Sequence, residues 1–265
     1  FARLYNIALA VSAPVLAAAV NSPLMLGRRL WHETRIAVFQ QSIDTRQSIA
    51  DMRELEPRVS FGRKWVDDSV LEIFKEDISR FKVLLGKAID EDPLSEMASG
   101  RAPKLKALQL FNSTVYRWNR ACYGVKDGVA HLRIENRVLP AGPTVLDEVA
   151  NAAFWFGLVS ALANEVDDVR DEIAFDAVRT NFVAAARHGI DAQLEWFGGR
   201  TWTAQELILS QLIPASERGL RAGGIDEDDI SRYLETIRQR VESRQTGAAW
   251  MLGSLAGMQE HGSPE

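Results

Sequence analysis

Strand-like sequence is concentrated in one part of the chain, and this feature limits the possible folds more than any other. It spans residues 114–138, where the turn-forming Lys126-Asp127-Gly128 separates two candidate strands. On both sides of this part the apolar residues recur at helical spacing, most clearly over residues 66–85 and after residue 144. A short antiparallel sheet segment packed with many helices is typical of the α+β class, which we expect here.

Pairs of polar residues spaced three apart predict three helix starts in the second half of the chain. These pairs are Thr144 with Asp147, Thr203 with Glu206, and Asp226 with Asp229. The first of these helices should continue through Asn164, and it should be buried because residues 154–162 are apolar almost all round.

Two breaks suggest where the chain divides. Residues 91–103 are rich in Pro, Gly and Ser and predict a loop, and Gly198-Gly199 interrupts the later helical pattern. We therefore expect a main domain over residues 1–198 and a helix-rich C-terminal lobe over residues 199–265.

The chain begins with Phe1 and an apolar run at residues 7–20. This run is shorter than the roughly 20 residues that span a bilayer, so a buried helix is the favoured interpretation. A signal peptide is the alternative, with Arg3 before the run and small residues 17–19 at its end. We expect the chain to be the C-terminal part of a longer protein.

Composition excludes several classes of partner. The 265 residues carry 31 basic and 36 acidic side chains, a net charge of −5, without the dense cationic patch that nucleic-acid binding needs. The single cysteine, Cys122, cannot form an intrachain disulfide, which suits the cytoplasm. We predict a cytoplasmic protein that binds neither nucleic acid nor a membrane.

Residues 131–138 are the most informative stretch for chemistry. In a strand, Arg133, Glu135 and Arg137 share one face, and alternating apolar residues share the other. A carboxylate between guanidiniums suits a site for a divalent cation and phosphate oxygens. On spacing alone, a solvated strand face with mutual ion pairs is the simpler interpretation.

A second candidate segment precedes it. Arg117 and Arg120 could clamp a carboxylate while Trp118 covers a ring, although exposed arginines around a buried tryptophan would give the same pattern. The sequence has no G-x-x-x-x-G-K-[ST], G-x-G-x-x-G or G-x-S-x-G motif, so the P-loop, Rossmann and hydrolase classes lack their signatures.

These two segments resemble known catalytic motifs. Residues 133–137 resemble the R-x-E-x-R strand of the glutamine synthetase catalytic fold, and Asn112-Ser113 followed by Arg117 is similar to the element that precedes it there. Taken together and in this order, they predict a glutamine synthetase-like antiparallel sheet segment.

The type 2 glutamate–cysteine ligase family, also called carboxylate–amine ligases, resembles the chain more closely. Its motifs are matched, in family order, by Asn21-Ser22-Pro23 followed by Gly27 and Arg35, by Trp118 with Arg120, by Glu135-Asn136-Arg137, and by residues 187–192. The resemblance implies that residues 1–198 are the C-terminal part of a ligase catalytic domain.

It also implies an activity and its cofactors. Such an enzyme uses ATP and Mg²⁺ to phosphorylate the carboxylate of glutamate or a related acid, and an amine such as cysteine then displaces the phosphate. By carry-over, Glu135 would bind the metal and Arg137 would contact the phosphates. Arg120, like Arg117, would hold the carboxylate of the acid or the acyl phosphate, and Arg137 and Arg120 would be the catalytic pair. The substrate- or nucleotide-binding residues implied in the same way are Arg35, Arg117, Trp118 and Arg133.

The chain departs from the family pattern in two ways. Trp118-Asn119-Arg120 is one residue shorter than the family's Trp-x-x-Arg, so either Arg117 or Arg120 could be the family arginine. The family's acidic metal-binding strand and its histidine-containing strand are not found here, so we expect activity only with upstream sequence. The alternatives are a ligand-sensing module and a dimerisation module, and an unpaired sheet edge would favour a homo-oligomer.

Overall fold

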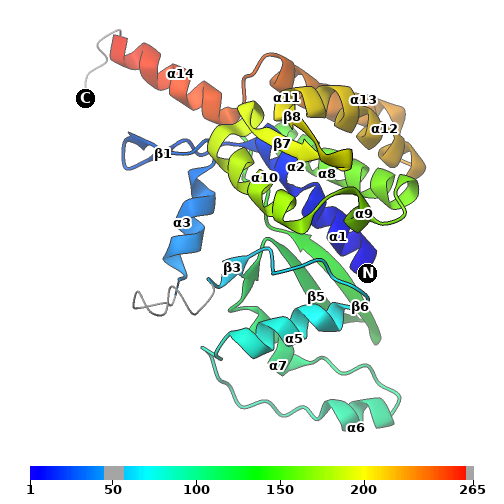
Figure 1. Ribbon diagram of the computed structural model, residues 1–265. Helices are drawn as coiled ribbons and strands as arrows, with labels where there is room; N and C mark the ends of the chain where they lie inside the picture. Colours follow the sequence, from blue (N-terminus) through cyan, green and yellow to red (C-terminus); the bar gives the residue numbers. More distant parts are fainter. Residues whose placement is uncertain (45–56, 261–265) are drawn as a thin grey trace. The chain divides into compact units, whose positions relative to one another are not determined.

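The computed structural model describes residues 1–44 and 57–260. The chain forms two compact units, each built from separate stretches of sequence. Unit 1 comprises Phe1–Tyr5 and Phe39–Arg137, and unit 2 comprises Asn6–Val38 and Val138–Glu265. Helices and short strands occur together, which confirms the α+β class (Figure 1).

The predicted hairpin is present in unit 1. Strands β5 (Asn119–Lys126) and β6 (Val129–Asn136) pair antiparallel along their whole length. Asp127 and Gly128 connect them, with φ of 53° and 77°, the conformation of a type I′ turn, in which Asp-Gly is a preferred pair. Just before the hairpin, β4 (Tyr116–Arg117) pairs in parallel with β3 (Val59–Ser60).

Three helices of unit 1 lie between β3 and β4 in the sequence. They are α5 (Val70–Arg80), α6 (Pro93–Ala98) and α7 (Lys106–Asn112). The helix predicted over residues 66–85 is therefore too long at both ends. The Ser69–Glu72 capping box sets its start, and Phe81 is already extended, with φ −114° and ψ 127°.

The loop predicted at residues 91–103 is partly wrong, because it contains α6. Asp92 caps this helix by accepting a hydrogen bond from the Leu94 amide, and Pro93 occupies its first position, where a missing amide costs nothing.

The N-terminal apolar run is buried, as predicted, but it forms two helices, α1 (Ala2–Ala10) and α2 (Ser12–Ala19). Every residue of α2 is buried. The axes of the two helices differ by 41° across the break. Pro14 falls in the first turn of α2, where no amide donor is needed, so it is compatible with a second helix but not with one continuous helix.

Helices α8 (Val145–Glu165), α12 (Ile213–Ala222) and α13 (Glu227–Glu242) pack on one another in unit 2 (Figure 1). Gly157 and Gly219 allow α8 and α12 to approach closely, and the Ser160 hydroxyl donates to the Gly219 carbonyl at 2.9 Å. By length and composition α8 could also cross a membrane, as could α1 and α2 taken together. Helices of this kind also form the cores of globular domains.

The remaining elements complete unit 2 and the links to unit 1. They are β1 (Leu24–Met25), β2 (Arg28–Arg29), α3 (Thr34–Ser42), α9 (Val169–Glu172), α10 (Phe175–His188), η1 (Gly189–Asp191), β7 (Gln193–Trp196), η2 (Phe197–Gly199), β8 (Arg200–Thr203), α11 (Ala204–Leu207), η3 (Ile208–Leu212) and α14 (Gly247–Glu260). The three predicted helix starts at residues 144, 203 and 226 are confirmed.

The predicted boundary at residue 198 falls inside unit 2. Gly198-Gly199 lies in the connection between β7 and β8, which pair antiparallel, so these glycines belong to a hairpin and not to a linker. The residues after this hairpin are largely helical, as expected for the C-terminal part, but they pack within unit 2. The assignment of residues 1–198 to a catalytic domain remains a prediction.

Candidate functional site

The β5–β6 hairpin brings Arg120, Glu135 and Arg137 together. Arg120 and Glu135 are direct partners in the strand register. The Arg120 side chain donates to Oε2 of Glu135, from Nε at 3.1 Å and from Nη2. Nε of Arg137 donates to the other oxygen, Oε1, at 2.9 Å. Each carboxylate oxygen of Glu135 therefore accepts hydrogen bonds from a different arginine.

These contacts fix the charge of Glu135. Partial burial works to raise its pKa, but the hydrogen bonds from Arg137 and Arg120 outweigh that effect and lower the pKa to about 2. Glu135 is therefore ionised at neutral pH, and its charge is compensated by the two guanidiniums.

Arg137 is held from three sides. Its backbone amide donates to the Trp118 carbonyl at 2.9 Å, and its guanidinium lies over the Tyr116 ring, 5.1 Å from the centroid. Its Nη1 is buried and has no hydrogen-bond partner in the described part of the chain. A buried guanidinium nitrogen without an acceptor is a position where an anionic ligand would be stabilised.

Arg133 lies on the same face of β6 but does not pair with Glu135. It is exposed, and its Nη1 lies 3.0 Å from Nε2 of His131. Beside it is a pocket of about 340 Å³ between α7 and the hairpin, and Arg120 and Arg133 both line this pocket. The predicted face therefore carries three arginines and one carboxylate, and it borders a cavity.

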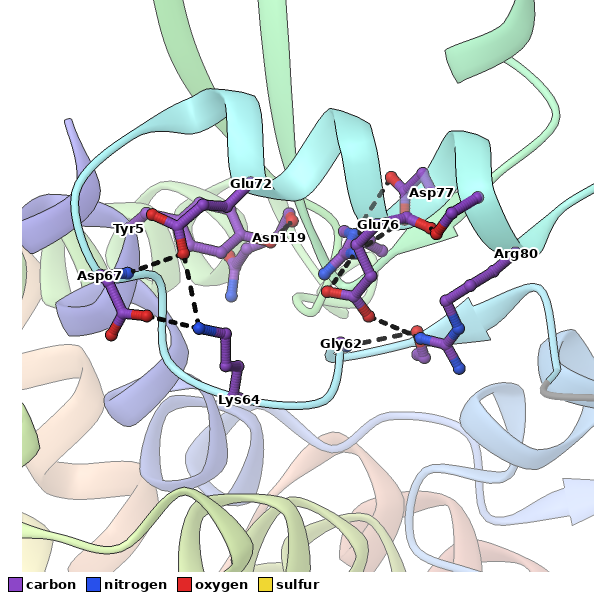
Figure 2. Close-up of polar contacts among 12 residues, drawn as sticks. Tyr5, Gly62, Lys64, Asp67, Glu72, Glu76, Asp77, Arg80 and Asn119 are labelled. Carbon is purple, nitrogen blue, oxygen red and sulfur yellow. Dashed lines mark hydrogen bonds and ion pairs between the residues drawn. The ribbon is translucent and has the colours of Figure 1, made fainter.

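Arg117 lies in a different environment. Its side chain is 6% exposed and donates to Asp77 of α5, from Nη2 at 2.7 Å and from Nε at 3.0 Å, while Glu76 lies 3.1 Å from Nη2. Figure 2 shows Glu76 and Asp77 on the face of α5 that carries these contacts. Of the two candidate arginines, the structure brings Arg120, and not Arg117, to Glu135.

Trp118 and Tyr5 complete this buried region. Trp118 is 1% exposed, and its ring lies 5.8 Å from that of Phe39, so it packs in the interior of unit 1. The Tyr5 hydroxyl donates to the Asn119 carbonyl at 2.8 Å, and burial raises the pKa of Tyr5 to about 12 (Figure 2). Neither Tyr5 nor Asp77 was predicted from the sequence, although Asp77 lies on the apolar face of α5, where a polar residue must be paired.

Arg35 belongs to unit 2 and has its own cluster. Its Nε donates to Oε1 of Glu33 at 3.0 Å, and Glu33 is completely buried. Glu33 also accepts hydrogen bonds from the Asn21 amide and the Ser22 hydroxyl, both at 2.7 Å. The Asn21-Ser22-Pro23 motif and Arg35 are thus joined through Glu33, a residue that the sequence analysis did not assign.

The donor set at the hairpin suits an anion better than a metal ion. Within residues 1–44 and 57–260, no group of three or more His, Cys, Asp and Glu side chains is arranged to hold a metal. Glu135 is the carboxylate of the arginine cluster, and both of its oxygens already accept hydrogen bonds. The described residues therefore fit phosphate or carboxylate oxygens, and they do not by themselves fit Mg²⁺.

Comparison with known proteins identifies the family. No curated protein sequence matches the chain significantly. A sequence model of the glutamate-cysteine ligase family 2, GCS2, matches residues 2–264. This match covers nearly the whole chain and confirms the resemblance found in its motifs. The protein belongs to glutamate-cysteine ligase family 2.

Proposed function

We propose that this protein is an ATP-dependent carboxylate–amine ligase of the glutamate–cysteine ligase type. The observation that carries the proposal is the Arg120–Glu135–Arg137 cluster, with Arg133 beside it, on the hairpin of a chain that belongs to GCS2. A ligase family requires a site that handles carboxylates and phosphates, and clustered guanidiniums supply it.

The proposed reaction has two steps. A carboxylate oxygen of glutamate or a related acid attacks the γ-phosphorus of ATP, the bond to ADP breaks, and an acyl phosphate forms. The nitrogen of an amine such as cysteine then attacks the acyl carbon, phosphate leaves, and the nitrogen loses a proton. The phosphoryl group stays highly charged throughout, so catalysis depends on positioning and charge neutralisation.

In this proposal the arginines have different roles. Arg120 and Arg137 stabilise the transferring phosphoryl group and the acyl phosphate, and Arg133 and Arg35 contact substrate or nucleotide. Arg117 and Trp118 are buried, so we assign them the indirect role of holding β4 and the start of the hairpin in place.

Mg²⁺ would compensate phosphate charge when bound with the nucleotide. Since the described residues do not fit the metal, we propose that its carboxylate ligands are supplied by sequence that precedes these 265 residues. We also keep the expectations of a cytoplasmic location, of a homo-oligomer, and of no nucleic-acid or membrane partner.

The test is an assay of the full-length protein with ATP, Mg²⁺ and panels of acids and amines. ADP release should require both an acid and an amine, and mass spectrometry should detect the amide. Arg137→Lys keeps the charge but loses the fixed geometry of the guanidinium, so it should lower kcat about 100-fold. Arg179→Lys, at an exposed position on α10, is the matched control.

Two outcomes would overturn the proposal in favour of its alternatives. Binding of an amino acid or nucleotide without ADP release would indicate a ligand-sensing module. A change in oligomeric state in Arg137→Lys, with unchanged nucleotide affinity, would indicate that the arginine cluster is a subunit contact.

A further inference from the structure

The pocket beside the hairpin has polar walls on both sides. Its volume is about 340 Å³, and α7 and the two strands of the hairpin form it. Its polar lining residues include Gln109, Asn112, Arg120, Cys122, His131 and Arg133. This lining contains two guanidiniums and no carboxylate among the described residues, so the pocket itself is cationic at neutral pH.

The charged residues around the pocket add to its positive charge. Glu135 lies behind Arg120, and its single negative charge is shared between Arg120 and Arg137. Three guanidiniums thus face one carboxylate in this region, although the chain as a whole carries a net charge of −5. A divalent cation at Glu135 would have to displace two arginines from it, whereas an oxoanion in the pocket needs no such displacement.

The hairpin also fixes the direction of Arg133. Nη1 of Arg133 lies 3.0 Å from Nε2 of His131, and because an arginine can only donate, this contact orients the Arg133 guanidinium along the hairpin. Gly124, the register partner of His131, makes room for this pair. A Cβ atom at Gly124 would lie 2.8 Å from Nε2 of His131 and 3.1 Å from Nη1 of Arg133.

We propose that this pocket binds an oxoanion, a phosphate or carboxylate group, directly through Arg120 and Arg133, and that Glu135 does not ligate a metal ion. The proposal refines the ligase function and rests on it only for the identity of the natural ligand. Metal-independent binding at this pocket is a property of the 265 residues themselves, and it can be measured without turnover.

The test is calorimetric titration of this chain in EDTA with two probes, inorganic phosphate and glutamate. At least one probe should bind saturably, and Mg²⁺ should leave its affinity unchanged. Tighter phosphate binding would assign the pocket to a phosphoryl group, and tighter glutamate binding would assign it to the acid substrate. Arg133→Ala and Arg120→Ala should each weaken binding at least 10-fold.

Two further variants test whether weaker binding comes from a change in the pocket or from a loss of folding. Gly124→Ala should weaken binding several-fold because it displaces His131 and Arg133, with circular dichroism unchanged. Arg101→Ala, at an exposed arginine paired with Glu96, is the control and should bind like the wild type.

Either of two results would overturn the inference. One is that neither probe binds in EDTA. The other is that binding appears only with a divalent cation and is lost in Glu135→Gln, with Mn²⁺ binding to the wild type but not to this variant. If the probes bind as expected and the full-length protein releases no ADP, the pocket stands and the ligase proposal fails.

Discussion

Arg117 and Arg120 are three positions apart and have opposite surroundings. Arg117 is buried and paired with Asp77 on α5, while Arg120 is paired with Glu135 across the hairpin. The first arginine fixes a strand, and the second lines a pocket. Residue type alone does not distinguish the buried arginine from the one that lines the pocket. Their different surroundings depend on which element packs against each side of the strand.

The buried Arg117 side chain leaves no room for a side chain at position 62, which is a glycine. Gly62 is buried with φ of +95°, and a Cβ atom there would lie 2.3 Å from Nη1 of Arg117. Arg117 cannot move aside without losing Asp77. We expect Gly62→Ala to lower the free energy of unfolding by about 3 kcal/mol, as for a broken buried ion pair. Urea denaturation, monitored by tryptophan fluorescence, measures this difference in the free energy of unfolding between the variant and the wild type.

Gly100 provides the matched control. It also has a positive φ, +72°, but a Cβ atom there would meet nothing within 4 Å. Gly100→Ala should therefore cost only the backbone strain, about 1 kcal/mol. Equal losses in the two variants would show that the contact with Arg117 does not matter.

The shared face of Arg133, Glu135 and Arg137 could be predicted from the sequence, because alternation along a strand is a local property. The pairing of Glu135 with Arg120 could not, because it depends on register across the turn. The roles of Asp77 and Glu33 were missed for a similar reason. Their partners lie 40 and 12 residues away, and only the folded chain brings them together.

At the scale of elements, turn and cap chemistry predicted more than periodicity did. Asp127-Gly128 correctly indicated the hairpin, and the Thr203–Glu206 pair correctly indicated the start of α11. Helical spacing over residues 66–85 overestimated α5, because apolar residues beyond Arg80 continue the pattern while the backbone is extended. Val83, Leu84 and Leu85 are in fact exposed.

Glu72 gives the start of α5 a measurable pH dependence. Its carboxylate accepts hydrogen bonds from the amides of Asp68, Ser69 and Asp67, at 2.7, 3.0 and 3.1 Å, and these bonds lower its pKa from 4.5 to about 2 (Figure 2). A pKa lowered by folding means that the stabilisation is complete above pH 4.5 and is lost as the pH falls towards 2.

We therefore expect Glu72→Gln to be less stable than the wild type at neutral pH, by about 1 kcal/mol. The difference should shrink between pH 4.5 and 2, as measured by urea denaturation at a series of pH values. Glu242→Gln, at an exposed position in the last turn of α13, is the control. A difference that stays constant down to pH 2 would contradict this account of the capping box.

At the scale of the whole molecule, the chain order does not follow the compact units. Residues 6–38 fold with residues 138–265, and the hairpin unit is inserted between them in the sequence. Composition shifts such as Gly198-Gly199 mark local turns and do not report contacts between distant segments. For this reason the α+β class could be predicted from the sequence, and the division into units could not.

Arg240 is one of the side chains that join the two distant segments of unit 2. From α13, its Nη1 donates to the Ala18 carbonyl of α2 at 3.1 Å, across 222 positions, and to Oδ1 of Asn151 at 2.6 Å. Its Nη2 donates to Oδ1 of Asp147 at 2.7 Å. The Ala18 carbonyl is in the last turn of α2, where the helix itself provides no donor.

Replacement of this buried cation should destabilise unit 2 as a whole. Arg240→Met removes the charge but keeps much of the volume, and it leaves Asp147 and the Ala18 carbonyl without these hydrogen bonds. We expect a loss of about 3 kcal/mol or more in the free energy of unfolding. At about 2–4 °C per kcal/mol, this lowers Tm by at least 6 °C in a calorimetric scan.

Arg238→Met is the control on the same helix, and it tests whether the loss of stability depends on the buried position of Arg240. Arg238 is 32% exposed, and its ion pairs with Glu217 and Glu235 are long, at 3.8 and 3.5 Å. Its replacement should change stability by less than about 1 kcal/mol. Similar Tm shifts for the two variants would mean that α2 and α13 are held together by apolar packing alone, and that Arg240 does not join the two segments of unit 2.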